Sequence, residues 1–344
     1  MKQRLLLTAF VLLTAVTGRA DVVINEKNFP DANFRNWVLS QEYGKDSVLT
    51  DDEIADVHEI DVCQKKIQSL KGIEHFTALT DLECDDNQLT SIDLSKNTAL
   101  DYLDCSHNQL SSLHLSKNTA LTDLDCSDNQ LKSLDLSNNI ALKKLRCHDN
   151  QLTSIDLSKN TALDYLDCGN NKLASLDLSN NIALDYLSCE DNRFKSLDVS
   201  NNTALIRLFC GNNQLTSLDV SKNTALLSLT CGDNHLISLD ISKNSALKLL
   251  ICNNNQLTSL DVSKNTALTR LTILKNQIKG EAMAALIESL PVADKGLLRV
   301  IQNGNEQNVI TTDQVAAANA KGWTTLGYDN KNMNEYEVKK AAVK

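Results

Sequence analysis

The stretch "LTDLDCSDNQLKSLDLSNNIA", residues 121–141, contains one cysteine, a regular series of leucines and two asparagines in similar phrases. Nearly the same 21 letters precede and follow it. The ten cysteines of the chain recur at this interval, at Cys63, Cys84, Cys105, Cys126, Cys147, Cys168, Cys189, Cys210, Cys231 and Cys252. A fixed period of this length indicates an architecture built by stacking copies of one short unit.

Written in units of 21 from Leu79, the chain gives nine full repeats to Ala267, and a tenth begins at Leu268. Each repeat reads L-x-x-L-x-C-x-x-N-x-L-x-x-L-D-L-S-x-N-x-A, with Leu, Ile, Val and Phe exchanging at the apolar positions. The fourth and sixth positions have the two-residue spacing of a strand, so both should point inward while the third and fifth point outward. Asparagines such as Asn129 and Asn139 fall where the backbone must turn, and their amides can satisfy unpaired peptide groups. One unit buries too few apolar side chains to offset its ordering entropy, so it should be stable only against its neighbours.

This phrasing resembles the leucine-rich repeat family, in the short bacterial form that nests two similar half-motifs in 21 residues. The resemblance covers residues 58–278. It implies an α/β solenoid: a right-handed coil of stacked short parallel strands with little helix in the repeats, a helical N-terminal cap and a small α/β C-terminal cap. The layout is similar to that of the internalins, and the resemblance implies a binding or adhesion protein.

The cysteine position is an inward seat with limited room, which suits a small and readily buried side chain. Disulfides are the alternative for ten cysteines in an exported protein. Parallel Cβ vectors in a stacked ladder do not suit the S–S torsion, so we expect buried free thiols. The chain has no C-x-x-C phrase and no Cys/His cluster of ligand spacing, and we therefore predict no metal in the ladder and no cofactor.

Residues 1–20 have the features of a secretory signal peptide. Lys2 and Arg4 precede an apolar run, and Gly18 and Ala20 mark a cleavage site before Asp21. The run is too short to span a bilayer, so we expect an exported chain, secreted, periplasmic or at the cell surface, that is not membrane-spanning. Loss of three basic residues would change the formal charge from −10 to −13, which opposes nucleic acid as a partner.

Residues 21–57 lack the repeat and predict a helical N-terminal cap. Phe34, Trp37 and Val38 form the apolar stripe of a short helix, and Thr50 with Glu53 forms a capping box at the start of a second. The loop between them resembles half of an EF-hand, with three carboxylates at ligand positions. Gly44 and Ser47 depart from that pattern, which favours a cap without metal. The metal candidates in this cap are Glu42, Asp46 and Glu53.

Residues 279–344 predict an α/β C-terminal cap followed by a tail. A helix presents Met283, Leu286, Ile287 and Leu290 on one face before Pro291. "LLRVI", residues 297–301, is typical of a strand. A second helix begins with the capping box of Thr311 and Gln314 and stops near Gly322. The polar residues 330–344 are expected to be loose.

An aspartate recurs at position fifteen of the repeat and is replaced only by His114. We expect backbone N–H groups and nearby serines to hold these carboxylates, with a cation-binding ladder as the alternative. The series is Asp93, Asp135, Asp156, Asp177, Asp198, Asp219, Asp240 and Asp261.

The outward positions three and five differ from coil to coil, and function should reside where a repeat is allowed to vary. They carry tyrosine, arginine and phenylalanine, which are enriched at interface hot spots. Unconstrained drift is the competing explanation. The candidate ligand-binding residues are Tyr102, Lys144, Arg146, Tyr165, Tyr186, Arg207, Phe209, Leu249 and Ile251.

We therefore predict a monomeric, non-catalytic binding protein that recognises a protein or host-surface ligand through this face. A carbohydrate binder that uses Tyr102, Tyr165 and Tyr186 is the alternative. An enzyme with its site in the C-terminal cap is the less favoured one, because none of the six histidines lies in a recognisable nucleophile or metal motif.

Overall fold

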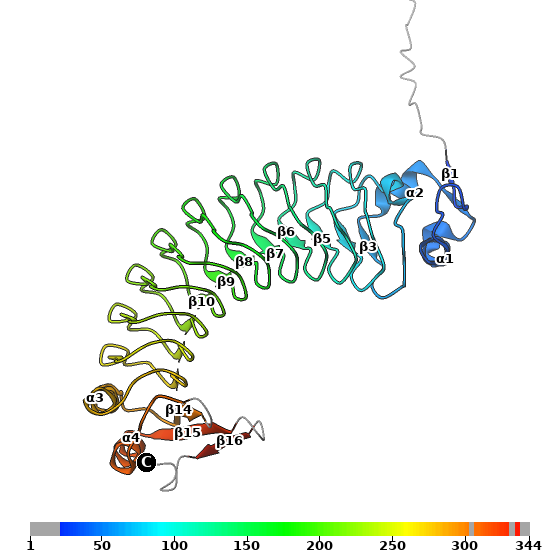
Figure 1. The fold of residues 1–344 in the computed structure, drawn as a ribbon. Helices are drawn as coiled ribbons and strands as arrows, with labels where there is room; N and C mark the ends of the chain where they lie inside the picture. The colour runs from blue at the N-terminus through cyan, green and yellow to red at the C-terminus, as the bar shows by residue number, and fades with distance from the viewer. Residues whose placement is uncertain (1–20, 303–305, 330–333, 338–344) are drawn as a thin grey trace, which may run out of the picture.

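The computed structural model describes residues 21–302, 306–329 and 334–337. The predicted signal peptide, residues 1–20, lies outside the described residues, as does most of the polar tail. The domain boundaries at residues 20, 57 and 278 stay predictions. The chain forms an arc of stacked coils with helices at both ends, and the short strands lie along its inner, concave side (Figure 1).

Each repeat contributes one three-residue strand, and each strand pairs in parallel with the next at a register of 21 residues, as Leu103 does with Leu124. Fourteen strands of the described chain form one continuous sheet in sequence order, which confirms the predicted solenoid of parallel strands. The strands of the coils are β3 (Glu59–Asp61), β4 (Asp81–Glu83), β5 (Tyr102–Asp104), β6 (Asp123–Asp125), β7 (Lys144–Arg146), β8 (Tyr165–Asp167), β9 (Tyr186–Ser188), β10 (Arg207–Phe209), β11 (Ser228–Thr230), β12 (Leu249–Ile251) and β13 (Arg270–Thr272).

The core is a column of leucines and cysteines that runs the length of the arc. The central leucine of each repeat strand from β4 to β13 is fully buried, and the nine cysteines from Cys84 to Cys252 have no exposed surface. All ten cysteines are free thiols. The inward prediction is therefore confirmed for nine of them and wrong for Cys63, which is half-buried. Cys63 belongs to the first coil, so only one neighbouring coil covers it.

Two columns of buried asparagines hold the turns, as the sequence predicts. Asn129 donates to the carbonyls of Cys105, Cys126 and Ser127 and accepts from the N–H of Leu110. Asn139 donates to the carbonyls of Leu115 and Asn118. Each column repeats the same bonds from coil to coil, so the peptide groups that the strands leave unpaired find partners in the neighbouring coil.

The aspartates of position fifteen are held as predicted. In all eight repeats that carry one, the carboxylate accepts from the backbone N–H of the serine two residues later, at 2.8 to 3.0 Å. That backbone bond and the serine side chain lower the pKa of carboxylates such as Asp177. These aspartates therefore close a turn on each coil.

The N-terminal cap contains α1 (Ala32–Ser40), the short helix η1 (Glu42–Gly44) and α2 (Asp51–Asp56). A two-stranded sheet pairs β1 (Val22–Val23) with β2 (Val48–Leu49). Phe34 and Val38 of α1 are buried, and the capping box of Thr50 and Glu53 is present, so both predicted helices are confirmed. A further short helix, η2 (Ile73–His75), lies in the first coil.

The C-terminal cap contains α3 (Glu281–Ser289), α4 (Thr312–Ala320) and three strands that extend the sheet. These strands are β14 (Gly296–Gln302), β15 (Trp323–Asp329) and β16 (Asn334–Glu337). Met283, Leu286 and Ile287 are buried, and Thr311 caps α4 as predicted.

The expectation of a loose tail is wrong for residues 334–337, which pair antiparallel with β15. The edge of β15 offers unpaired backbone groups, and a polar segment can satisfy them without an apolar pattern of its own. No helix in the described part of the chain is long and apolar enough to cross a membrane.

Candidate functional site

The outward side chains of the strands line the concave face, and the centre of that face carries a continuous row of contacting groups. Arg146 of β7, Tyr165 of β8, Tyr186 of β9 and Phe209 of β10 form what we call the aromatic strip. The strands stack at about 4.8 Å, so outward side chains of successive coils come into direct contact, either at the same position, as for Tyr165 and Tyr186, or two residues apart, as for Phe209 and Tyr186. Of the predicted binding residues, the structure brings these four together in one row.

The geometry of the aromatic strip is that of a ladder. The rings of Tyr165 and Tyr186 are stacked with centres 4.2 Å apart and planes 7° apart. Phe209 lies 5.5 Å from Tyr186 at an angle of 44°. On the other side, the guanidinium carbon of Arg146 lies 5.0 Å from the centre of the Tyr165 ring, a cation–π contact. Both faces of Tyr165 are therefore covered by neighbours.

Two aspartates of β6 fix Arg146. Its Nη1 lies 3.2 Å from Oδ1 of Asp123, and its Nε lies 3.9 Å from Oδ2 of Asp125. Burial disfavours the charge of Arg146, but these two carboxylates outweigh burial and raise the pKa of the guanidinium. Sequence reasoning did not assign Asp123 and Asp125 to the site. The repeat register could have identified them, because Asp123 and Asp125 occupy the two outward positions of the coil that precedes Arg146.

The concave face is acidic toward the N-terminal end. Glu83 and Asp104 lie on β4 and β5, and burial together with neighbouring carboxylates raises the pKa of each. Tyr102 lies among them, and burial followed by the charges of Asp104 and Glu83 raises its pKa to about 12. The strand β6 lies between Tyr102 and Arg146, the first residue of the aromatic strip, so the structure does not bring this predicted residue into the strip.

The face becomes basic and apolar toward the C-terminal end. Arg207 is exposed and pairs in register with Tyr186, so it borders the aromatic strip. Leu249 and Ile251 of β12 are half-buried rather than fully exposed, and β11 separates them from Phe209. The last predicted residue, Lys144, lies nearer the N-terminal end, on β7, and its Nζ is 3.6 Å from the carboxylate of Asp123. The nine predicted residues thus share one face but form one contiguous cluster only at its centre.

A polar hollow of about 410 Å³ opens beside the aromatic strip, at the ends of β9, β10 and β11. Gly232 leaves room in its wall for the side chain of Asn253, whose Oδ1 would lie 2.6 Å from a Cβ at that position. Sequence reasoning missed these residues because the turn after each cysteine looked purely structural. The lining residues are Glu190, Asp191, Gly211, Asn212, Thr230, Gly232, Asp233 and Asn253.

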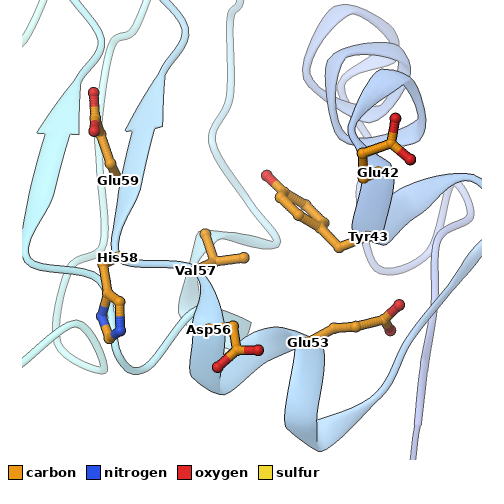
Figure 2. Close-up of a pocket in the computed structure, with 7 residues that line it drawn as sticks. All are labelled: Glu42, Tyr43, Glu53, Asp56, Val57, His58 and Glu59. Carbon is orange, nitrogen blue, oxygen red and sulfur yellow. The ribbon is translucent and has the colours of Figure 1, made fainter.

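A second hollow, of about 580 Å³, lies between the N-terminal cap and the first coil, and Figure 2 shows Glu42 and Glu53 on its wall. Each carboxylate of the EF-hand-like loop already has a local partner. Glu42 pairs with Lys45 at 2.5 Å, Asp46 accepts from the N–H of Val48, and Glu53 accepts from Thr50. Asp46 does not line this hollow, so the structure does not gather the three carboxylates around it.

Comparisons with known proteins agree with the fold. A sequence profile described as "Leucine Rich repeats (2 copies)" matches residues 140–181. Internalin J of Listeria monocytogenes is 38% identical over 71 residues, which are 20% of this chain and only 8% of that protein.

Solved structures extend the likeness over most of the chain. The internalin InlF of Listeria monocytogenes is 22% identical with a TM-score of 0.69, and the alignment covers 89% of this chain and 96% of that one. A leucine-rich repeat protein of Leptospira interrogans is 20% identical with a TM-score of 0.63, over 81% of this chain and 79% of that one. The repeats, the stacked parallel strands and these likenesses together show that the chain has the leucine-rich repeat fold and is similar to internalins.

Proposed function

We propose that this protein is a non-catalytic, exported binding scaffold whose concave face recognises a protein ligand, with the aromatic strip as the anchor. The observation that supports this most directly is the contact row from Arg146 through Tyr165 and Tyr186 to Phe209. Leucine-rich repeat proteins are generally binding scaffolds. A stacked ladder loses little side-chain entropy when a ligand arrives, because its side chains are already held in place.

The charges around the aromatic strip indicate which charges a complementary ligand would carry. Carboxylates on β4 to β6 flank it on one side, and Arg207 with Arg270 extends on the other. A complementary surface would place basic groups against the N-terminal coils, an apolar or aromatic group against the strip, and acidic groups against the C-terminal coils. We therefore propose a folded protein partner with this order of charges, and an affinity that falls as salt concentration rises.

A glycan is the second candidate, and the polar hollow beside Phe209 is the observation that favours it. Carboxylates and amides next to aromatic rings can hold sugar hydroxyls and ring faces. The geometry of the strip weighs against it, because a sugar needs an open ring face and both faces of Tyr165 are covered. Inside the hollow, Asp233 already accepts from Asn253 and Asn254. A protein ligand fits the arrangement better.

The proposal is tested with variants borrowed from other coils of the same chain. Serine occupies position three at Ser228, so Tyr165→Ser and Tyr186→Ser keep a residue type that this position accepts. Tyr102→Ser is the matched control, since Tyr102 has the same repeat position but lies outside the strip. Parent and variants would be immobilised and exposed to surface proteins of host cells and of bacteria, and captured proteins would be identified by mass spectrometry.

The affinity of a captured partner would then be measured for each variant. Loss of a hot-spot tyrosine should weaken binding by about 30-fold, and the Tyr102 control should stay within about twofold of the parent. Circular dichroism and urea midpoints would establish that all the variants are folded. Retention of every partner by the double variant Tyr165→Ser/Tyr186→Ser would refute the aromatic strip as the anchor. Binding of the parent to a glycan array, without any protein partner, would favour the second candidate.

A further inference from the structure

A cluster of imidazole and carboxylate groups lies at the edge of the concave face, just beyond β7. Nδ1 of His148 lies 2.9 Å from Oδ2 of Asp149 and 3.9 Å from Oδ2 of Asp128. Nε2 of His107 lies 3.6 Å from that same Asp128 oxygen. Three potential metal donors, from Asp128, His148 and Asp149, therefore lie within 4.8 Å of one another, and a fourth, from His107, lies beside Asp128.

The backbone of the repeat explains how they meet. His107, Asp128 and Asp149 occupy the eighth position of consecutive repeats, where the backbone has φ values of 50°, 52° and 53°. Asparagine, aspartate and histidine adopt this left-handed conformation more readily than other non-glycine residues. The equivalent side chains are thereby stacked along one edge, one coil spacing apart, and His148 at the seventh position points into the same row.

The separations match the requirements of a small divalent ion. Donor atoms bound to Zn²⁺ at about 2.0–2.1 Å in tetrahedral geometry lie about 3.3 Å from one another. Three of the donor pairs here, His148–Asp149, His107–Asp128 and His148–Asp128, are separated by 2.9, 3.6 and 3.9 Å. Ordinary side-chain adjustment would bring all of them to this value. The side chains of His107, Asp128, His148 and Asp149 are 56%, 32%, 30% and 41% exposed, so an ion can reach them from solvent.

An outer partner also holds one of the carboxylates. Asn170, at the eighth position of the next coil, donates to Oδ1 of Asp149 and leaves Oδ2 directed at His148. Second-shell bonds of this kind orient the ligands of metal sites in proteins. Nitrogen and carboxylate donors together favour Zn²⁺, Ni²⁺ or Cu²⁺ over Ca²⁺, which prefers oxygen donors only.

We propose that His148, Asp149 and Asp128, with His107 as a fourth donor, form a binding site for a divalent transition-metal ion such as Zn²⁺. The site is independent of the proposed ligand-binding function, although it adjoins Arg146 through the chain. It escapes a search for local metal motifs, because its histidines are 41 residues apart and only the period of the repeat makes them neighbours.

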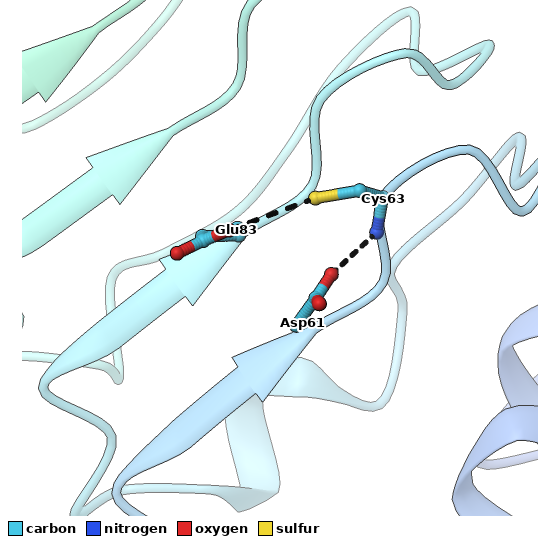
Figure 3. Close-up of side chains that lie close together, drawn as sticks. All are labelled: Asp61, Cys63 and Glu83. Carbon is cyan, nitrogen blue, oxygen red and sulfur yellow. Dashed lines mark hydrogen bonds between the residues drawn. The ribbon is translucent and has the colours of Figure 1, made fainter.

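A second group of potential metal donors lies on the first coils but has other partners. Asp61, Cys63 and Glu83 lie close together on the first coils, as Figure 3 shows. There, however, the Cys63 thiol donates to Asp85, and Asp61 accepts from the N–H of Cys63. Burial, followed by the hydrogen bonds and charges of Asp85 and Asp61, raises the pKa of this thiol and disfavours the thiolate that a metal would bind. Nothing else in that place indicates a ligand.

The test is a titration of the full, folded chain with Zn²⁺ alone, followed by calorimetry and by competition with a chromophoric chelator. The variants are again taken from other coils, so that the fold accepts them. Ser127 occupies the seventh position and Asn170 the eighth, which gives His148→Ser, His107→Asn and Asp149→Asn. The matched controls are His235→Gln, where Gln214 is the equivalent residue, and Cys63→Ser, which removes the other group.

We expect one Zn²⁺ per chain in the parent and in both controls. Loss of an outer partner of a metal ligand typically weakens binding 10- to 100-fold, so His148→Ser should weaken it by about 100-fold or more. His107→Asn should weaken it by about tenfold, and Ca²⁺ should not compete. The proposal is overturned if the parent binds no Zn²⁺, if binding survives in His148→Ser/Asp149→Asn, or if Cys63→Ser abolishes it.

Discussion

The two buried asparagines of each repeat look alike in the sequence but have unequal roles. Asn129 makes four hydrogen bonds with backbone groups, including the N–H of Leu110. Asn139 makes two, and its Oδ1 has no partner in the described part of the structure. The same amide side chain therefore satisfies more of the fold at the ninth position than at the nineteenth.

Alanine at these two positions should consequently have different costs. Asn129→Ala leaves a buried N–H and up to three carbonyls without their partner, and should destabilise the protein by about 3–5 kcal/mol. Asn139→Ala removes two donated bonds together with an unsatisfied oxygen, and should cost only about 1–3 kcal/mol. Urea denaturation followed by circular dichroism measures both. Equal costs, or the reverse order, would contradict this account of the two columns.

The thiols offer a second prediction at this scale. Burial raises the pKa of the cysteines in the column, that of Cys231 to about 12, so that the reactive thiolate is scarce as well as inaccessible. At pH 8 a maleimide should modify at most one thiol of the native chain, Cys63, and all ten in denaturant. Mass spectrometry counts the adducts. Rapid labelling of two or more thiols in the native chain would show that the column is open to solvent.

Residue-scale prediction worked where a rule acts within one coil. Two-residue spacing is enough to send Leu124 and Cys126 inward, and both are fully buried. It failed where the neighbour on another coil decides. Cys63 occupies the same position in its coil as the buried cysteines, but no repeat precedes it, and it is only half-buried. Likewise, the contact of Arg146 with Asp123 joins residues that are 23 positions apart in the sequence.

Among the elements, the turn closed by aspartate gives the chain a dependence on pH. Hydrogen bonds from Ser179 and Ser200 lower the pKa of Asp177 and Asp198 below the ordinary value. A carboxyl with a lowered folded-state pKa stabilises the fold above the unfolded-state value, about 3.9, and loses that contribution as the pH falls toward the folded-state pKa. Acid should therefore weaken these turns below about pH 4.

The double variant Asp177→Asn/Asp198→Asn tests this, because an asparagine oxygen can accept the same bonds at every pH. The urea midpoint of the parent should fall further between pH 7 and pH 3 than that of the variant. Asp104→Asn is the control of opposite sign. Burial raises the pKa of Asp104, so its charge is unfavourable at neutral pH and its replacement should steepen the acid loss. Identical acid losses in the parent and both variants would rule out this explanation.

Element-scale signals explain which parts of the caps could be predicted. The capping boxes at Thr50 and Thr311 predict helices from a few consecutive residues, and both helices are present. The strand β16 gave no such signal, because its pairing with β15 depends on an edge that is formed elsewhere in the chain.

At the scale of the whole molecule, the repeat is both the structural unit and the unit of tolerated change. Each coil contacts mainly its two neighbours, so stability is approximately a sum over units and their interfaces. Because neighbouring coils have nearly the same turns, the interface between one pair of coils can replace the interface between another pair. The outer side of each coil is wider than the strand side, which bends the stack and leaves the strands on a concave face (Figure 1).

Removal of one whole unit should therefore preserve the fold and the site. Deletion of residues 226–246 removes β11 and brings β10 next to β12 in the same register, while the aromatic strip and the four metal donors remain. We expect a folded chain that is shorter by one coil, about 4.8 Å, and that keeps Zn²⁺ binding and its protein partner. Deletion of residues 226–230 alone is the control, because it shifts Asn234 onto a leucine position and Leu239 onto an asparagine position, and it should unfold the C-terminal coils. Circular dichroism, small-angle scattering and urea denaturation distinguish the two. If both deletions unfold the chain alike, long-range cooperativity rather than neighbour stacking holds the solenoid together, and the coil-by-coil account of the site loses its basis.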